Sequence, residues 1–569
     1  MSGSSKIESS LPDSSACSRW VYVAVALAAF SIRFWFSSSR DIGFDEAWDI
    51  FVARQSLWGD LFKAVAATSH PPAFYFLLHF VGLLGSAQIF DPLVSVICGV
   101  VSVLLVGKIL RELGVSKSAE YAGMLLCAFS QVHIAISVIV RPYALANCCM
   151  SLSFFFFLRL LRSRFLSRSA SFFFFGFLCA ALFSHYSAGL YACALFLMLI
   201  ILAVLDRSVR GDLRQACLPF SAGVVRFFAA PLFALLFLVY LALSAQGSLF
   251  ASKSLLATRD PLQLTPYRYL RSFVYSGAEP ISTYVTRNSA AEYSLFFPSA
   301  GSDAISILVL FALLGLMVAA GVRTAVQSSS RTGACRAAVY LLLPCSFLVL
   351  LALGLLAKYP FGGELRQQFF VFSFGLVAIV ALLDSLPLRA PTKNLIFVAL
   401  VGASIARLMT TPLDDSEFGK LVPFSKTSSV LREGKPIFIG TWTAFTLYGQ
   451  NRDAHLQLRS RGEIATEYEV LTEEGRSRLF VAPQVYFESY SENELAQRVK
   501  NLMLGENLSE LYVVGFPLGR IRCKVCDKKV VQRSLAEQLG DEEFEVVIER
   551  ERTKNGEGYA IVRRKSAER

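Results

Sequence analysis

The chain has 569 residues, of which 54% are hydrophobic and only 17% are charged, and its mean hydropathy is +0.51. Soluble domains contain about 25% charged residues, so this composition excludes an ordinary soluble enzyme. The net charge of +12 does not indicate a nucleic-acid partner, because the basic residues lie mainly in short stretches between apolar segments, as in membrane proteins. We therefore expect a polytopic α-helical membrane protein.

The amino-terminal segment is polar and rich in serine, and residues 1–19 are predicted to form a disordered cytoplasmic tail. The apolar stretch behind it is too long for a removable signal peptide and lacks a clear small-residue cleavage site. This stretch therefore predicts a retained first membrane span.

Eleven apolar segments are candidate spans, because each comes close to the roughly 20 residues that cross a bilayer. They lie at about 20–38, 92–110, 119–140, 143–161, 171–186, 188–205, 223–245, 303–322, 337–357, 367–385 and 394–411.

Residues 71–90 are also apolar, but counting them as a span would reverse the side of every later loop. Pro71 and Pro72 suit the first turn of a helix, and His79 interrupts the apolar surface. We expect a helix that lies along the outer membrane interface.

Short basic loops follow every even-numbered span, as the positive-inside rule requires of cytoplasmic loops. This pattern places the amino terminus in the cytoplasm and the carboxyl terminus outside an inner (plasma) membrane. The basic residues of the five loops are Lys108, Arg111, Lys117; Arg159, Arg162, Arg164, Arg168; Arg207, Arg210, Arg214; Arg323, Arg331, Arg336; Arg389 and Lys393. The predicted outer segments are 39–91, 246–302, 358–366, the turns near Arg141 and His185, and the tail from 412.

The tail has a different composition from the rest of the chain. Strand-like runs at 435–442, 510–516 and 544–549 alternate with helix-like runs at 491–504 and 533–540, which is typical of an α/β domain. The predicted organisation is therefore a cytoplasmic tail (1–19), a transmembrane catalytic domain (20–411) and an extracytoplasmic α/β domain (425–569).

Two of the twelve cysteines, Cys523 and Cys526, form a CxxC motif in this tail. A zinc site would need a second pair or nearby histidines, and neither is present in the sequence around it. A local disulfide or a structural loop is favoured over redox catalysis or metal binding.

The first candidate site element is the acidic run 41–50, DIGFDEAWDI, just after the first span. Asp45 and Glu46 stand between Phe44 and Trp48, which suits an interfacial wall better than a free loop. A carboxylate there could accept a proton from an attacking hydroxyl. Simple solvation of these acids remains the alternative.

Two histidines are candidates at other predicted outer positions. His70 precedes Pro71 and Pro72, which restrict the backbone, and His185 lies at the outer end of the fifth predicted span. A structural histidine at a helix end is the alternative in both cases.

Basic residues complete the set. Arg141, followed by Pro142 and Tyr143, lies between two predicted spans, where its fork of donors could bind a phosphate or reach the membrane interface. Lys358 and Arg366 enclose the glycine-containing segment 359–365, whose glycines permit close backbone approach to a ligand. Such an inventory of carboxylates, histidines and guanidinium groups suits a reaction between a membrane-borne anionic donor and an outside acceptor, with cations stabilising the leaving group.

The ordered motifs FDEAW (44–48), SHPPAFYFLL (69–78), VRPYAL (140–145), SHY (184–186) and YPFGGELR (359–366) resemble those of GT-C glycosyltransferases. The most similar branch is the bacterial one related to protein O-mannosyltransferases and the lipid A aminoarabinose transferase. The resemblance covers about residues 20–410 and specifies the superfamily better than the substrate.

The resemblance implies inverting transfer of a sugar from a polyprenyl-phosphate carrier to an extracytoplasmic protein, lipid or glycan. Asp45 would be the catalytic aspartate and Glu46 its acidic companion. Binding of the donor phosphate or substrate would fall to His70, Arg141, Tyr143, His185, Lys358 and Arg366.

One departure affects the expected cofactors. Many relatives carry an acid just before the arginine of the second outer loop, whereas this chain has Val138, Ile139 and Val140. We therefore predict no required metal or other cofactor, and a divalent metal, although possible, is not supported.

Two other classes of function remain as alternatives. A transporter or flippase for a lipid-linked substrate would show internal repeats and charged residues near the middle of its spans, and the sequence shows neither a convincing repeat nor charges at mid-span. A non-catalytic scaffold would have Asp45 far from a cavity or engaged in a salt bridge.

Overall fold

The computed structural model describes most of the membrane region and part of the tail. The described residues are 14–38, 44–54, 58–66, 68, 70–84, 90–217, 273–277, 279–296, 303–327, 330–362, 365–410, 436–439, 455–461, 465–472, 475–481, 494–517, 539, 544–549 and 557–565.

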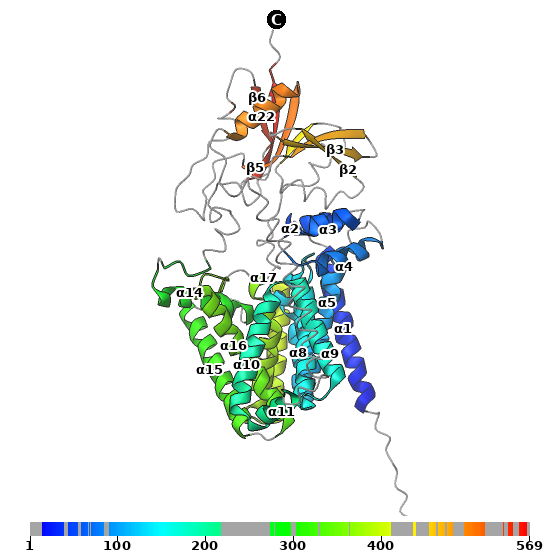
Figure 1. Ribbon diagram of the computed structural model, residues 1–569. Coiled ribbons are helices and arrows are strands. Elements are labelled where there is room, and N and C mark those ends of the chain that lie inside the picture. Colours follow the sequence, from blue (N-terminus) through cyan, green and yellow to red (C-terminus); the bar gives the residue numbers. More distant parts are fainter. Residues whose placement is uncertain are drawn as a thin grey trace, which may run out of the picture.

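The helices of the first 410 residues form a bundle (Figure 1). Among the described residues, seven helices are long and apolar enough to cross a membrane, or up to eight spans if the bent pair α6–α7 is one span. The seven are α1 (Ser14–Ser38), α5 (Leu93–Glu112), α8 (Tyr143–Arg162), α10 (Ser187–Leu205), α15 (Asp303–Gln327), α16 (Arg331–Leu355) and α19 (Ala390–Thr410), and the bent pair is α6 (Lys117–Phe129) and α7 (Gln131–Ser137).

Two further predicted spans are helices of less than bilayer length. These are α9 (Arg168–Ser184), with 17 residues, and α18 (Phe370–Ser385), with 16. Most residues of α18 are buried inside the protein, so this helix packs among the other helices of the bundle. Every predicted span that the structure describes coincides with a helix, and the one at 223–245 lies outside the described residues.

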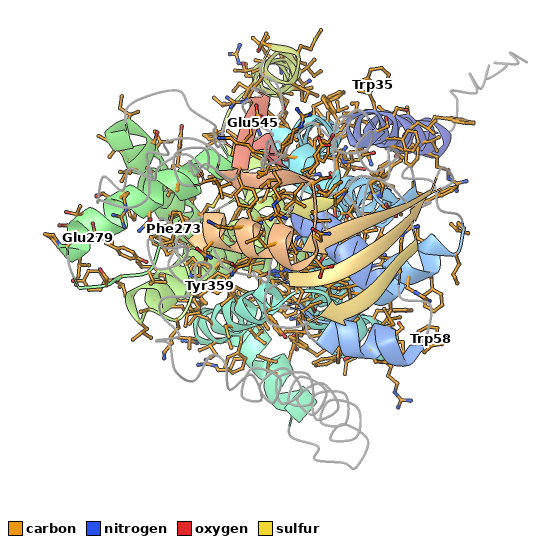
Figure 2. The ribbon with its side chains drawn as sticks, turned by 90° about the horizontal axis from the view of Figure 1, so that it is seen from above. Trp35, Trp58, Phe273, Glu279, Tyr359 and Glu545 are labelled. Atoms are coloured by element: carbon orange, nitrogen blue, oxygen red, sulfur yellow. The ribbon has the colours of Figure 1, made fainter. Side chains whose placement is uncertain are left out.

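Three short helices lie across one end of the bundle: α2 (Phe44–Ala53), α3 (Trp58–Ala66) and α4 (Ala73–Gly82) (Figure 1). Helix α4 has ten residues, about 15 Å, which is half the thickness of the hydrocarbon core. It is therefore not a span, as the topology required. Phe74, Tyr75 and Leu78 are buried, whereas Trp58 of α3 is half exposed at the edge of the molecule (Figure 2).

The two ends of the bundle differ as the loop charges predict. Helices α2–α4, α14 (Ile281–Phe296) and α17 (Leu365–Gln368) lie at one end, and α11 (Arg207–Cys217), which belongs to a predicted basic loop, lies at the other (Figure 1).

A buried cation lies inside a span, near one end of its helix, and the sequence pattern did not single it out. Arg33 of α1 is 0% exposed and lies five residues before the end of its helix. It was missed because a single arginine near a helix end is usually explained by reaching the interface.

The described residues of the tail form a seven-stranded sheet of order β2-β3-β4-β1-β5-β7-β6. Strand β1 (Ile437–Ile439) is parallel to β4 (Gly475–Val481) and to β5 (Glu510–Pro517). The other pairs are antiparallel and involve β2 (His455–Arg461), β3 (Ala465–Thr472), β6 (Phe544–Glu549) and β7 (Glu557–Arg564).

Helix α22 (Glu494–Gly505) supplies Val499, Leu502 and Met503 to a core that includes Leu511 and Val513 of β5. The predicted strands at 435–442, 510–516 and 544–549 and the helix at 491–504 are confirmed. The sheet lies beyond the end of the bundle that carries α2–α4 (Figures 1 and 2). Most of the predicted helix at 533–540, together with Cys523 and Cys526, lies outside the described residues.

Gly362 provides a test of how the segment before α17 is packed. Its φ is +63°, and a Cβ would lie 2.0 Å from the carbonyl oxygen of Asn288 in α14. We expect Gly362→Ala to destabilise the protein by about 2 kcal/mol or more, because left-handed backbone and a clash with main chain add together. The thermal midpoint of the purified protein in detergent measures this effect.

Gly402→Ala is the matched control, because a Cβ at Gly402 meets nothing within 4 Å and alanine favours a helix interior. Equal midpoints for the two variants would contradict the packing described for Gly362.

Candidate active site

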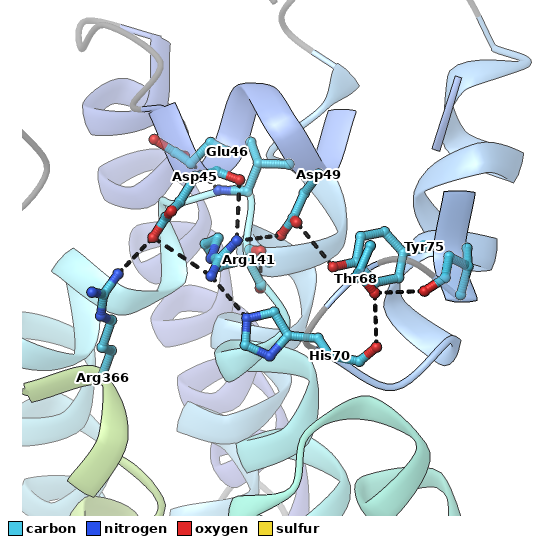
Figure 3. A network of polar contacts seen from close by, with 11 residues as sticks. Asp45, Glu46, Asp49, Thr68, His70, Tyr75, Arg141 and Arg366 are labelled. Carbon is cyan, nitrogen blue, oxygen red and sulfur yellow. Dashed lines mark hydrogen bonds and ion pairs between the residues drawn. The ribbon is translucent and has the colours of Figure 1, made fainter. Parts of the chain in front are cut away.

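The site is centred on Arg141, which lies between α7 and α8. Its Nη1 donates to Asp49 Oδ2 at 2.9 Å and to the main-chain oxygen of Asp45 at 3.1 Å. Asp45 and Asp49 are four residues apart on α2, so they share one face of the helix. The Arg141 side chain is only 8% exposed, and its Nη2 lies 3.6 Å from Asp45 Oδ2. Figure 3 shows these contacts around one guanidinium group.

Glu46 holds the turn that carries Arg141. Its Oε1 accepts from the backbone N–H of Val140 at 2.6 Å, and the side chain is fully buried. The second acid of the FDEAW motif therefore fixes the main chain next to Arg141. This contact uses the backbone, so the absence of an acidic side chain at 138–140 does not disturb it.

Arg366 reaches the same cluster from α17, more than 300 residues away along the chain. Its Nη1 donates to Asp45 Oδ2 at 2.7 Å. Both arginines contact Oδ2 of Asp45, and the Asp45 side chain is 35% exposed. Asp45 is thus the carboxylate of this cluster that solvent can reach, whereas Glu46 and Asp49 are 0% exposed.

Two histidines and a tyrosine form the wall on the bundle side. His70 Nε2 lies 2.8 Å from Arg141 Nη2, and arginine can only donate, so this nitrogen accepts. The rings of His70 and His185 have centroids 5.2 Å apart, and Tyr143 lies 5.0 Å from His185. His185 Nδ1 accepts from the backbone N–H of Ser187 at 3.1 Å.

The electrostatics separate the two aspartates. Burial would raise the pKa of Asp45, but the charges of Arg141 and Arg366 outweigh it, so its pKa is lowered. Burial raises the pKa of Asp49 to about 7, and the charge of Asp45 adds to the increase, whereas Arg141 and Tyr75 oppose it. The cluster can therefore carry a charged carboxylate beside one that titrates near neutral pH.

Both histidines are held neutral. Burial lowers the pKa of His70 well below its usual value, and Arg141 and His185 lower it further. Burial, together with Arg141 and Arg366, lowers the pKa of His185 to about 3. Neutral imidazoles can hydrogen-bond but add no positive charge to the site.

The structure brings together Asp45, Glu46, His70, Arg141, Tyr143, His185 and Arg366 from five separate sequence motifs. Lys358 does not join this network: it follows the end of α16, and its side chain is exposed.

Sequence reasoning did not assign a role to Asp49 or Tyr75. The Tyr75 hydroxyl donates to Asp49 Oδ1 at 3.0 Å, so Asp49 links α4 to Arg141. The spacing of Asp45 and Asp49 was a usable signal for Asp49, but nothing in the pattern singled out Tyr75. Across the residues that the structure describes, no group of three His, Cys, Asp or Glu side chains is arranged to hold a metal.

Comparison with known protein families finds a match to part of the chain. Residues 69–233 match the sequence model of the dolichyl-phosphate-mannose-protein mannosyltransferase family. The segment is less than a third of the chain, and it contains His70, Arg141, Tyr143 and His185. The predicted resemblance is confirmed over this segment.

Several solved structures resemble the chain weakly. An oligosaccharyltransferase, AglB from Archaeoglobus fulgidus, in complex with an inhibitory peptide and a dolichol-phosphate, is 10% identical, with a TM-score of 0.46 over 87% of this chain and 69% of its own. ArnT from Cupriavidus metallidurans, bound to undecaprenyl phosphate, is 14% identical, with a TM-score of 0.42 over 77% of this chain and 75% of its own. The arabinofuranosyltransferase AftD from Mycobacteria is 12% identical, with a TM-score of 0.44 over 97% of this chain and 40% of its own. A search of curated proteins finds no significant match.

The raised pKa of Asp49 predicts a pH dependence of stability. The pKa of Asp49 is about 7 in the folded protein, above its ordinary value of 3.8. The folded state therefore binds the proton more tightly than the unfolded state does. The contribution of Asp49 is therefore fully present below pH 4 and is lost as the pH rises through 7, at no more than about 1.4 kcal/mol per pH unit.

Thermal midpoints of the wild type and of Asp49→Asn, measured from pH 5 to pH 8, test this linkage. The wild type should lose stability relative to the variant as the pH rises. A difference that grows in favour of the wild type would contradict the assignment.

Proposed function

We propose that the protein is a membrane glycosyltransferase that moves a sugar from a polyprenyl-phosphate-linked donor to an extracytoplasmic acceptor, with inversion, and that Asp45 is the general base. The observation that carries the proposal is the position of Asp45, a partly exposed carboxylate held between Arg141 and Arg366. The description of the matching family names a dolichyl-phosphate sugar as the donor, which is the same chemical class.

The three carboxylates of α2 are not equally available for chemistry. Glu46 binds the Val140 backbone and Asp49 binds Arg141 and Tyr75, and both are fully buried. One accessible carboxylate can deprotonate an acceptor hydroxyl, whereas a covalent intermediate needs a nucleophile and a separate acid–base group. A single displacement follows, and this inverts the anomeric centre.

The arginines supply the charge that a departing polyprenyl phosphate needs. Arg366 is 21% exposed and is bound to Asp45 through Nη1, so a phosphate can share its guanidinium group. When the phosphate takes part of this positive charge, the pKa of Asp45 rises and the carboxylate becomes a stronger base. Donor binding would thereby activate the base.

The remaining predicted residues would shape the binding surface. His70, His185 and Tyr143 form a neutral wall that offers hydrogen bonds without competing for the phosphate charge. Lys358 lies at the other end of the segment that leads to Arg366, and we propose it as an outer contact for the donor headgroup.

The site faces the extracytoplasmic side in this proposal. The support is that the basic loops lie at the bundle end opposite α2–α4 (Figure 1), as positively charged cytoplasmic loops would. The carboxyl-terminal sheet is then also outside.

The alternatives meet specific obstacles. The scaffold alternative predicted a salt-bridged Asp45, and Asp45 does pair with Arg141 and Arg366. What favours the proposed base is that the Asp45 side chain remains 35% exposed. A transporter needs charged residues that line a path for the substrate. The N–H groups of buried Arg33 instead donate to neighbouring protein atoms.

Asp45→Asn tests the proposed base. We expect transfer to fall by about 100-fold or more, because a positioned base contributes roughly 10²–10⁴-fold and an amide cannot accept the proton. The assay follows gene-dependent surface glycans by mass spectrometry and uses dolichyl-phosphate mannose and undecaprenyl-phosphate sugars as purified donor probes.

Glu279→Gln is the control, because Glu279 pairs with Arg287 at 2.8 Å outside the site cluster, and this variant should keep its activity. Full transfer by a folded Asp45→Asn protein would end the assignment of Asp45.

Arg366→Gln separates donor binding from base strength. Loss of this cation should weaken binding of undecaprenyl phosphate and raise the pKa of Asp45. The acid limb of the pH–rate profile should therefore move to higher pH, because Asp45 must be deprotonated to act. An unchanged acid limb together with unchanged affinity would contradict both functions of Arg366.

A further inference from the structure

Arg33 is a buried arginine whose N–H groups all point to acceptors inside the bundle. Nε donates to Ser137 Oγ at 2.9 Å, and Nη1 donates to the main-chain oxygens of Ala29 (3.1 Å) and Ala128 (3.2 Å). Nη2 donates to the oxygen of Cys127 at 3.3 Å and lies 2.7 Å from His133 Nδ1. Five donors thus meet five acceptors, and none of these acceptors is a carboxylate.

Two of the three carbonyl acceptors, those of Cys127 and Ala128, lie at a break in a span. Helix α6 ends at Phe129, and α7 begins at Gln131 with a bend of 56°. In a continuous helix, the oxygens of Cys127 and Ala128 would accept from residues 131 and 132. At the break these carbonyls need other donors, and Arg33 supplies them. The partial negative charge of a helix carboxyl end also suits a cation.

Arg33 contacts α7 near both of its ends. His133 is in its first turn and Ser137 is its last residue. A seven-residue helix is not stable by itself, so the position of α7 depends on tertiary contacts, and those of Arg33 are among them. Gly99 of α5 packs directly against Ser137 and Arg33. A Cβ at this position would be 2.5 Å from Ser137 Cβ and 3.0 Å from Arg33 Nε, so the close packing requires glycine.

The turn at 138–142 follows α7 directly and carries the site. Val140 N–H is bound by Glu46, and Arg141 binds Asp45, Asp49 and His70. The turn is therefore held from outside by α2 and from inside by α7. We propose that Arg33 is a positioning residue that sets the location of Arg141 through the broken helix α6–α7. This inference rests on the proposed function for its effect on turnover, but not for its effect on the turn.

A charged group in a span is costly, which makes the arrangement informative. Carbonyls at a helix break could be satisfied by water or by a neutral side chain. An arginine is needed if several acceptors must be held in one fixed geometry, because its planar fork has a rigid shape.

Arg33→Met removes the donors and keeps an apolar side chain in the bundle. We expect faster amide hydrogen exchange at residues 131–142, including the Val140 N–H, and a decrease in kcat of about 10- to 100-fold, the scale expected for misplaced catalytic groups. Binding of undecaprenyl phosphate should change less than kcat. Arg33→Lys keeps the charge without the fork and should show the same changes more weakly.

Arg336→Met is the matched control. Arg336 also donates to carbonyls at a helix end, Leu113 at 2.8 Å and Gly114 at 2.9 Å, but it lies at the basic-loop end of the bundle. The Arg336→Met substitution should lower the thermal midpoint and leave kcat and amide exchange at 138–142 unchanged. Unchanged exchange at 131–142 in both Arg33 variants, or kcat losses equal to those of Arg336→Met, would overturn the proposal.

The exchange measurement distinguishes the two levels of inference. If no donor probe supports transfer but exchange at 131–142 rises in Arg33→Met, the proposed function fails and the positioning of the turn stands. If wild-type transfer is observed and both Arg33 variants retain full kcat with unchanged exchange, only the positioning proposal fails.

Discussion

The ion pairs of Arg141 are the interaction on which the site depends. Its guanidinium group is almost fully buried and joins α2, the segment at His70 and the turn before α8. A buried charge that loses its partner costs about 3–5 kcal/mol. Separating these three parts of the chain would therefore destabilise the protein. The short helices across the end of the bundle are thereby tied to the spans beneath them, and α4 is included through Tyr75 and Asp49.

The same interaction gives two aspartates on one helix different properties. Asp49 lies under Arg141 in a closed environment, and burial raises its pKa to about 7. Asp45 lies one turn away, where Arg366 reaches it and solvent remains accessible, and its pKa is lowered. Different environments for neighbouring carboxylates are a common way to assign separate tasks in catalysis.

The site is built at helix ends, and its geometry depends on residues beyond those that could meet a substrate. Glu46 fixes the main chain of the Arg141 turn from one side, and Arg33 holds α7 on the other. Catalytic groups must be held to within about 0.5 Å of their productive geometry, and a seven-residue helix cannot provide this alone. The buried polar contacts within the span therefore belong to the same structural unit as the site.

The local chemistry of the sequence determined the membrane character, most helix positions and the grouping of five motifs at one end, because hydropathy and loop charge are properties of short segments. It also identified Asp45, Arg141 and Arg366 as members of one site. Tertiary structure decided the rest: that Glu46 binds backbone, that Asp49 and Tyr75 join the cluster, that Lys358 stays apart, and that Arg33 is buried. These outcomes depend on which distant atoms meet, such as Asp45 with Arg366 across more than 300 residues, and no local pattern encodes such distances.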